Sequence, residues 1–249
     1  MSAAAVMRAA PVALVLLSGC MASRAVAPLD AGQHGVTLSL GGPFVQFGGA
    51  PVPVPFTHLG YRYGIDGHTN VHAGLQVSTP LLVGVAAFDV GIARELLTAQ
   101  GPRPRLMLEY TTTFAVGDAS SGPAPGGFRF FQDLALVATW DLPAREGRRP
   151  HRIYLGADAF MGVGPSFGAV VTPFLGTELR ASKTVGVQLE LDWHAPFTRT
   201  TFVAPVWYGP GDQGVVGAKL ALTFYVPPKR PKAVLRPRKA RVADPEEAP

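Results

Sequence analysis

The chain has 249 residues, of which 16% are charged, and it contains 29 Gly and 24 Pro. This much Gly and Pro excludes a mostly helical protein, while 47% apolar residues exclude a disordered one. The formal net charge is +5 at pH 7. Residues 227–249 hold seven bases and three acids, a net of +4, which leaves +1 for residues 1–226. The charge therefore belongs mainly to the C-terminal tail, and no nucleic-acid partner is expected.

The first nineteen residues have the order of a secretory signal peptide. One positive charge, Arg8, precedes the apolar stretch 9–17, which is too short to span a bilayer. After residue 20 no window offers the 18 or more consecutive apolar residues of a membrane helix. The sequence therefore predicts export, and any later crossing of a membrane has to be made by strands.

The signal peptide ends in the run 17–20, Leu-Ser-Gly-Cys, and Cys20 is the only cysteine of the chain. This ending resembles a bacterial lipobox. The resemblance implies that Cys20 carries a diacylglyceryl group, and two or three acyl chains anchor a protein stably. Met21 stands where an aspartate would imply retention in the inner membrane, so the resemblance implies the outer membrane. The alternative is ordinary cleavage after Ala22 or Ala27, without a lipid.

Between residues 35 and 226 apolar and polar side chains alternate with the period of two that half-buried strands require. The clearest case is 185–194, where Val, Leu and Trp alternate with Gly, Gln, Glu, Asp and His. The same pattern predicts nine further strands, four of them weaker: 59–65, 70–77, 106–114, 133–141 and 217–226, then 35–42, 82–94, 152–161 and 169–180. In the last of these, Pro173 indicates a bend or a bulge.

The connections between these ten strands differ in length. Two are tight turns, 66–69 and 181–184, and three are long and rich in Gly and Pro, 43–53, 117–130 and 196–213. With a periplasmic N-terminus, the long connections all fall on the extracellular side, as in outer-membrane barrels. Three connections fit this rule less well, 95–104, 142–151 and 78–81. Eight or twelve strands are therefore left open.

The polar face of the strands predicts a lumen. A soluble barrel or sandwich turns a face dense in Lys, Glu and Asp outward, whereas this face is mostly Gly, Thr, Gln and Ala with isolated charges of both signs. The predicted lumenal polar network consists of Arg62, Glu109, Asp133, Asp158, Glu178, Arg180, Glu190, Asp192, His194 and Lys219. Aromatic side chains lie on the apolar face toward strand ends, where an interfacial girdle belongs: Tyr61, Tyr63, Phe114, Trp140, Trp193 and Phe224.

Over nearly its whole mature length this pattern resembles the small outer-membrane β-barrel proteins of Gram-negative bacteria. The resemblance implies an all-β fold, an antiparallel up-and-down transmembrane barrel of about ten strands surrounded by outer-membrane lipids. It rests on the pattern, and no diagnostic motif accompanies it. Such barrels usually end in a terminal aromatic residue, whereas here Phe224 and Tyr225 are followed by the basic tail.

Catalytic and metal-binding patterns are thin. Asp192 and His194 lie two apart on one face, an arrangement that suits a general base, but a lumenal polar network explains them better. No hydrolase motif surrounds the loop serines Ser120, Ser121 and Ser166. His68 and His72 are joined by no cysteine or acid cluster, so no metal is expected. No phosphate-binding loop is present, so no cofactor is expected and an enzyme is not favoured; a hydrolase at the barrel rim is the last alternative.

These patterns divide the chain into a signal peptide at 1–19, an N-terminal linker at 20–34, a β-barrel at 35–226 and a disordered basic tail at 227–249. With an even strand number the tail leaves the barrel on the side of Cys20, where anionic headgroups or the cell wall would attract it. The first expected function is a structural or surface-interaction role through the long connections. The alternatives are a narrow channel for small solutes or ions and a soluble, lipid-anchored ligand-binding barrel. The sequence names no small-molecule ligand.

Overall fold

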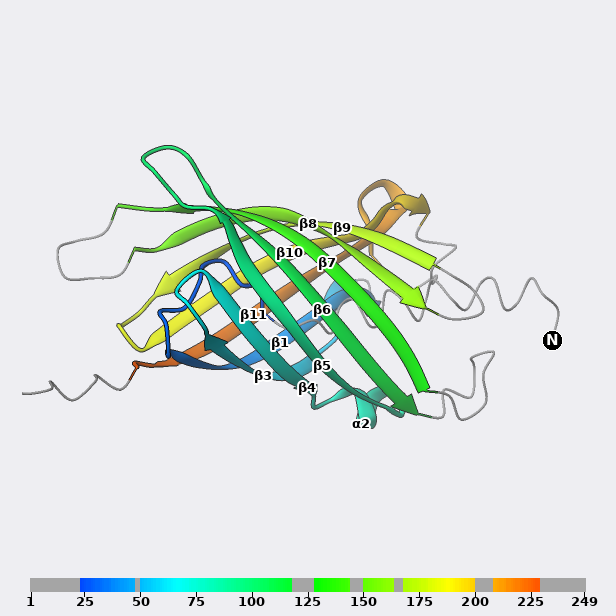
Figure 1. Ribbon diagram of the computed structural model, residues 1–249. Helices are drawn as coiled ribbons and strands as arrows, with labels where there is room; N and C mark the ends of the chain where they lie inside the picture. The colour runs from blue at the N-terminus through cyan, green and yellow to red at the C-terminus, as the bar shows by residue number, and fades with distance from the viewer. Residues whose placement is uncertain are drawn as a thin grey trace, which may run out of the picture.

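The computed structural model describes residues 23–47, 50–117, 128–143, 150–163, 168–199 and 208–228. They form a closed antiparallel β-barrel, in which neighbouring strands follow one another in sequence and β11 pairs with β1 (Figure 1). The predicted up-and-down barrel of ten strands is confirmed among these residues. No helix of the described part of the chain is long and apolar enough to cross a membrane.

The ten barrel strands have these bounds: β1 (His34–Phe47), β3 (Phe56–Gly64), β4 (Thr69–Gln76), β5 (Val85–Leu97), β6 (Arg105–Gly117), β7 (Phe128–Asp141), β8 (Arg152–Val163), β9 (Gly168–Arg180), β10 (Val185–Arg199) and β11 (Gln213–Val226). A short strand, β2 (Ala50–Pro53), pairs with the end of β1. A helical turn, α2 (Thr79–Val83), precedes β5, and a 3-10 turn, η1 (Pro210–Asp212), precedes β11. We use "near end" for the barrel end where β1 begins and β11 ends, and "far end" for the opposite one.

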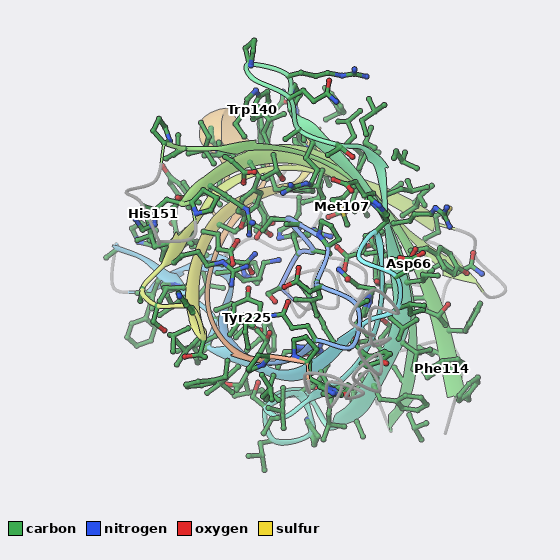
Figure 2. All side chains as sticks on the ribbon, turned by 60° about the vertical axis from the view of Figure 1, so that its left-hand side comes forward. Asp66, Met107, Phe114, Trp140, His151 and Tyr225 are labelled. Atoms are coloured by element: carbon green, nitrogen blue, oxygen red, sulfur yellow. The ribbon has the colours of Figure 1, made fainter. Side chains whose placement is uncertain are left out.

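The alternation of side chains decides which face of each strand is exposed. On β10, Leu189 is 46% exposed and its neighbour Gln188 only 6%. Leu189 pairs with Leu220 of β11, and Gln188 pairs with Ala221, so each outward residue meets an outward one. Figure 2 shows the same division around the barrel, with Phe114 and Trp140 outside the ring of strands and Met107 and Tyr225 on its inner side.

Most strands differ from their predicted bounds by a few residues, and β1 runs to Phe47, into the connection expected at 43–53. The strand expected at 82–94 begins at Val85, because Pro80 starts the helical turn α2 and Gly84 ends it with φ of +69°. Strand β7 begins at Phe128, five residues earlier than predicted. Strand β10 continues beyond His194 through a bulge, where Ala195 takes a φ of +48°.

Pro173 causes no bulge against β8, because it pairs with Ala157 in unbroken register. On the other side of β9, pairing with β10 stops at Phe174, the residue after the proline. A proline has no N–H to donate, which is compatible with pairing that ends beside it.

The barrel closes between β1 and β11. Thr37 and Thr223 lie opposite each other across this seam, and their hydroxyls are 2.9 Å apart. Gly41 takes a φ of +150° there, and a Cβ on it would lie 2.1 Å from the carbonyl oxygen of Ala218. The seam therefore requires glycine at this position.

At the near end, the turn between β3 and β4 is held by Asp66, one of the residues marked in Figure 2. Its carboxylate accepts hydrogen bonds from the backbone N–H groups of His68, at 2.9 Å, and Thr69, at 2.6 Å. The bond from His68 contributes most to lowering the pKa of Asp66 below its ordinary value. The Asp66 side chain thus accepts backbone hydrogen bonds that strand pairing does not provide within the turn.

Candidate functional site

The N-terminal segment, residues 23–33, lies inside the barrel, and we use "plug segment" for it. Ser23, Arg24, Ala25 and Val26 are between 0 and 5% exposed. Figure 2 shows this part of the chain, in blue, within the ring of strands. The sequence pattern predicts a linker at 20–34. It does not indicate that residues 23–33 lie inside the barrel.

The plug segment enters from the near end and runs toward the middle of the barrel. Gln33 and Gly64 are joined by a backbone hydrogen bond at the near end. Deeper in the lumen, Leu29 N donates to Asn70 Oδ1 at 2.8 Å, and Ala25 N donates to Glu109 Oε2 at 3.0 Å. Side chains of the barrel wall therefore replace the strand pairing that an extended segment otherwise needs.

At the inner end of the plug segment, Arg24 contacts three carboxylates, those of Asp133, Asp158 and Glu190, which we call the acidic site. Arg24 Nη1 lies 3.4 Å from Asp133 Oδ2, Nη2 donates to Asp158 Oδ2, and Nε lies 3.6 Å from Glu190 Oε1. The guanidinium carbon also lies 4.4 Å from the centre of the Phe174 ring. The Arg24 side chain is 3% exposed, so its charge is compensated by the wall and not by water.

The backbone of Arg24 is held from the opposite side. Its carbonyl oxygen accepts hydrogen bonds from Arg62 Nη1 at 2.9 Å and from Gln188 Nε2 at 3.1 Å. Arg62 Nη2 also donates to Ser23 Oγ at 3.2 Å. Both the side chain and the main chain of Arg24 are therefore fixed.

A second base joins this region. Lys219 Nζ lies 2.7 Å from Glu190 Oε1 and 3.8 Å from Asp192 Oδ1, and Tyr154 donates its hydroxyl to Glu190 Oε2 at 3.0 Å. Arg24 and Lys219 together face four carboxylates, those of the acidic site and Asp192. With every acid ionised, the formal charge of this central cluster is −2.

A further network lies at the near end around Glu178. This carboxylate accepts Arg152 Nη1 at 2.7 Å and the Tyr225 hydroxyl at 2.7 Å, and it lies 2.9 Å from Arg180 Nε. Arg180 also stacks over the Tyr225 ring, with its guanidinium carbon 3.9 Å from the ring centre. Arg152 continues the network to Asp141, whose Oδ1 lies 2.8 Å from Arg152 Nε.

All ten residues of the predicted polar network face the lumen; nine are buried and Arg62 is half-buried. The structure brings Asp133, Asp158 and Glu190 together around Arg24, and it places Glu178 and Arg180 in the near-end network. Glu109 Oε1 lies 3.8 Å from His72 Nδ1. His194 Nδ1 lies 3.2 Å from Thr172 Oγ1.

Sequence reasoning missed Arg24, which organises the central cluster. One signal was available, because Arg24 is the sole charged residue between Arg8 and Asp30. The buried pair of His58 and Asp89 was missed as well, because His58 lies one residue before the predicted strand 59–65 and Asp89 lies in one of the weaker predicted strands.

The residues weighed for chemistry are dispersed. Asp192 pairs with Lys219, whereas His194 hydrogen-bonds Thr172. Within the described ranges no group of three or more His, Cys, Asp or Glu could hold a metal ion. His68 pairs with Glu95 at 2.6 Å. Ser120, Ser121 and Ser166 lie outside the described residues, as do Cys20 and the tail beyond Pro228.

A small cavity lies beside the plug segment. A cavity of about 10 Å³, lined by Leu29, Arg62, Arg152 and their neighbours, is the size of a single water site. Buried apolar side chains fill another part of the lumen, where the rings of Phe131 and Phe160 stack 5.3 Å apart. In these two regions the described lumen is occupied by protein side chains and main chain.

Comparison with known proteins gives a fold likeness at most. No protein-family model matches the chain, and no curated protein has a similar sequence. Ail, the attachment invasion locus protein of Yersinia pestis, is 10% identical over 79% of this chain and 99% of its own, with a TM-score of 0.27. The translocator domain of the autotransporter NalP from Neisseria meningitidis is 8% identical over 88% and 94%, with a TM-score of 0.37. The CymD monoaromatic hydrocarbon channel is 8% identical over 79% and 88%, with a TM-score of 0.34. At these scores the likeness carries no argument about function.

Proposed function

We propose that the chain spans the bacterial outer membrane as a barrel with a filled lumen, and that its role is structural or surface-interacting. The observation that carries this proposal is the distribution of charge between the two faces of the strands. The lumen holds the acidic site and the near-end network, whereas the outer face is almost uncharged.

The outer face is apolar around the whole circumference. Every barrel strand contributes large apolar side chains that are at least 36% exposed, among them Val36, Leu38, Leu59, Leu75, Val90, Ile92, Tyr110, Leu134, Leu136, Ile153, Leu155, Leu175, Leu189, Leu191, Leu220 and Phe224. Soluble monomers rarely expose contiguous apolar patches beyond a few hundred Å². A continuous apolar band on a closed barrel matches the hydrocarbon layer of a membrane.

Charged residues are nearly excluded from this band. Among the outward positions of the described strands, and leaving aside Arg199 beyond the bulge of β10, Arg94 is the only Asp, Glu, Lys or Arg. It lies close to the near end of β5, three residues before Leu97 ends that strand. A long basic side chain at this depth can reach the headgroups.

Aromatic side chains mark both ends of the band. Tyr61 and Trp140 lie toward the near end, while Phe88, Phe114 and Phe128 lie toward the far end. The rings of Phe88 and Phe114 stack 4.9 Å apart. Aromatic girdles of this kind belong at the two membrane interfaces.

The filled lumen favours an interaction or structural role over an open channel. A barrel of about eight strands is just filled by side chains, and ten strands leave only slightly more room. Here the plug segment takes that room. The same packing weighs against a soluble ligand-binding barrel, which needs both a cavity for the ligand and a polar outer face.

Two features outside the described residues complete the proposal. Lipid on Cys20 would anchor the N-terminus, and the basic tail would contact anionic headgroups or the cell wall. Two of the near-end connections, 65–68 and 181–184, are tight turns, which supports a periplasmic near end; the segments joining β6 to β7 and β10 to β11 would then face the exterior.

The experiment that tests membrane insertion uses the full-length protein in a Gram-negative host, with Cys20→Ser beside the unchanged chain. Membranes are washed with sodium carbonate and floated on a sucrose gradient. A spanning barrel stays with the outer membrane in both versions and needs detergent for release. Release of the Cys20→Ser protein by the wash would mean that lipid alone holds a soluble domain, and would overturn the proposal.

A further inference from the structure

The acidic site has the chemistry that selects a guanidinium group. Carboxylates can accept the fixed fork of N–H donors, and an aromatic ring can stack on the planar cation. Here Asp133 and Asp158 approach the two terminal nitrogens of Arg24, and Phe174 lies 4.4 Å from its central carbon. A compact ammonium would use the carboxylates and leave the stacking face unused.

The wall carries more acceptor capacity than Arg24 satisfies. Asp133 Oδ1 and Asp158 Oδ1 have no hydrogen-bond partner among the described residues, although both side chains are 1% exposed. With every acid ionised, the formal charge of the central cluster is −2 with Arg24 present and −3 without it. Unpaired carboxylates in a closed lumen are strongly unfavourable and would draw in another cation.

Arg24 is bound to this site as a ligand is, without belonging to the wall. It precedes β1 by ten residues and makes no strand pairing with the barrel. Its contacts to Asp133 and Asp158 join residues 109 and 134 positions apart. No pairing between barrel strands therefore depends on the contacts of Arg24.

We propose that the lumen contains a guanidinium-binding site formed by Asp133, Asp158, Glu190 and Phe174, and that Arg24 occupies it as a tethered ligand. The plug segment is then detachable, and a vacated site takes up free guanidinium compounds. This inference deepens the proposed barrel function and rests on its filled lumen. It does not depend on the lipid at Cys20.

The test is chemical rescue of Arg24→Ala in the full-length protein, purified in detergent. Thermal unfolding is followed in millimolar guanidinium, methylammonium or sodium chloride at equal ionic strength. We expect Arg24→Ala to have a lower Tm than the unchanged protein and to regain part of the loss in guanidinium only. Exposed Arg103→Ala is the matched control, with no loss and no rescue. Adding Asp133→Asn and Asp158→Asn should abolish the rescue.

Equal stabilisation by all three salts, or none by guanidinium, would overturn the proposal. If Arg24→Ala does not fold, a second measurement follows how accessible the plug segment is to a thiol reagent. Ser23→Cys in a Cys20→Ser background should react slowly with a thiol reagent, and millimolar guanidinium should speed the reaction relative to sodium. An unchanged rate would equally overturn it. A failure of membrane insertion shows instead in the flotation experiment, which leaves these detergent measurements unaffected.

Discussion

His58 Nε2 lies 2.7 Å from Asp89 Oδ2, and this buried pair reaches from β3 to β5 across the intervening strand β4. Gly74 of β4 lies beneath it. A Cβ at Gly74 would be 2.1 Å from His58 Nε2 and 2.9 Å from Asp89 Oδ1. The absence of a side chain at Gly74 is what allows the two partners to meet.

Gly74→Ala should therefore separate His58 from Asp89 or displace β4, at a cost of about 1–3 kcal/mol typical of overpacking. The measurement is urea unfolding of the detergent-solubilised protein. Gly60→Ala is the matched control, since its Cβ would approach His58 only to 3.1 Å. Equal stability of both variants would show that the pair tolerates a methyl group beneath it.

Leu189→Arg should destabilise the membrane-inserted barrel by about 2–4 kcal/mol, because Leu189 faces outward well inside β10. Val226→Arg should cost only about 0–1 kcal/mol, because Val226 is outward-facing at the last position of β11. The two residues are 46% and 51% exposed, so the comparison isolates depth. Unfolding in lipid vesicles measures both. Similar tolerance at the two positions would argue for water outside the barrel.

Glu178→Gln should be among the more damaging single changes, at about 3–5 kcal/mol, because it leaves Arg152 and Arg180 facing a neutral group. Tyr225→Phe removes a single hydrogen bond to the same carboxylate and should cost about 1.5–3 kcal/mol. Thermal unfolding in detergent ranks the variants. A smaller loss for Glu178→Gln than for Tyr225→Phe would contradict the charge argument.

Cys20→Ser should abolish incorporation of radioactive fatty acid into the protein, because the lipobox-like ending provides no other acceptor thiol. The unchanged chain is the positive control in the same cells. Labelling that persists in the variant would place the acyl group elsewhere. Migration of an unlabelled wild-type chain at the size of a processed protein would instead support ordinary cleavage.

An epitope inserted after Glu247 should be protected from protease on intact cells and become accessible when the outer membrane is permeabilised. The physical reason is that β11 ends at the near end, beside the turns at 65–68 and 181–184. A second epitope between Gly117 and Phe128 should be cleaved on intact cells. The reverse pattern would invert the proposed orientation.

Most of the barrel could be predicted, because a period of two is imposed by backbone geometry on every strand. The charges at Glu109, Glu190 and Lys219 were assigned to the lumen on this ground alone. Pairing partners could not be predicted in the same way. Glu190 forms ion pairs with Arg24, near the start of the chain, and with Lys219, near its end. No local sequence pattern identifies contacts between residues so far apart.

The period of two could not predict that the plug segment lies inside the barrel. Alternation identifies a strand whose two faces meet different environments. Arg24 and Val26 instead lie in a segment that is enclosed on every side. An even strand number puts Cys20 and the tail on the same side only if the chain before β1 stays at the near end. Because Ser23 is already within the lumen, parity fixes the side on which β11 ends and leaves the position of Cys20 unassigned.

Closure between β1 and β11 also has a consequence for assembly. The seam joins residues as far apart as Thr37 and Thr223, 186 positions along the chain, and such distant pairing is slow to form. The wall that surrounds Arg24 comes from β7, β8 and β10, which are synthesised late. Until the last strand docks, the wall around Arg24 is incomplete. We therefore expect the plug segment to become fully buried only when β1 pairs with β11.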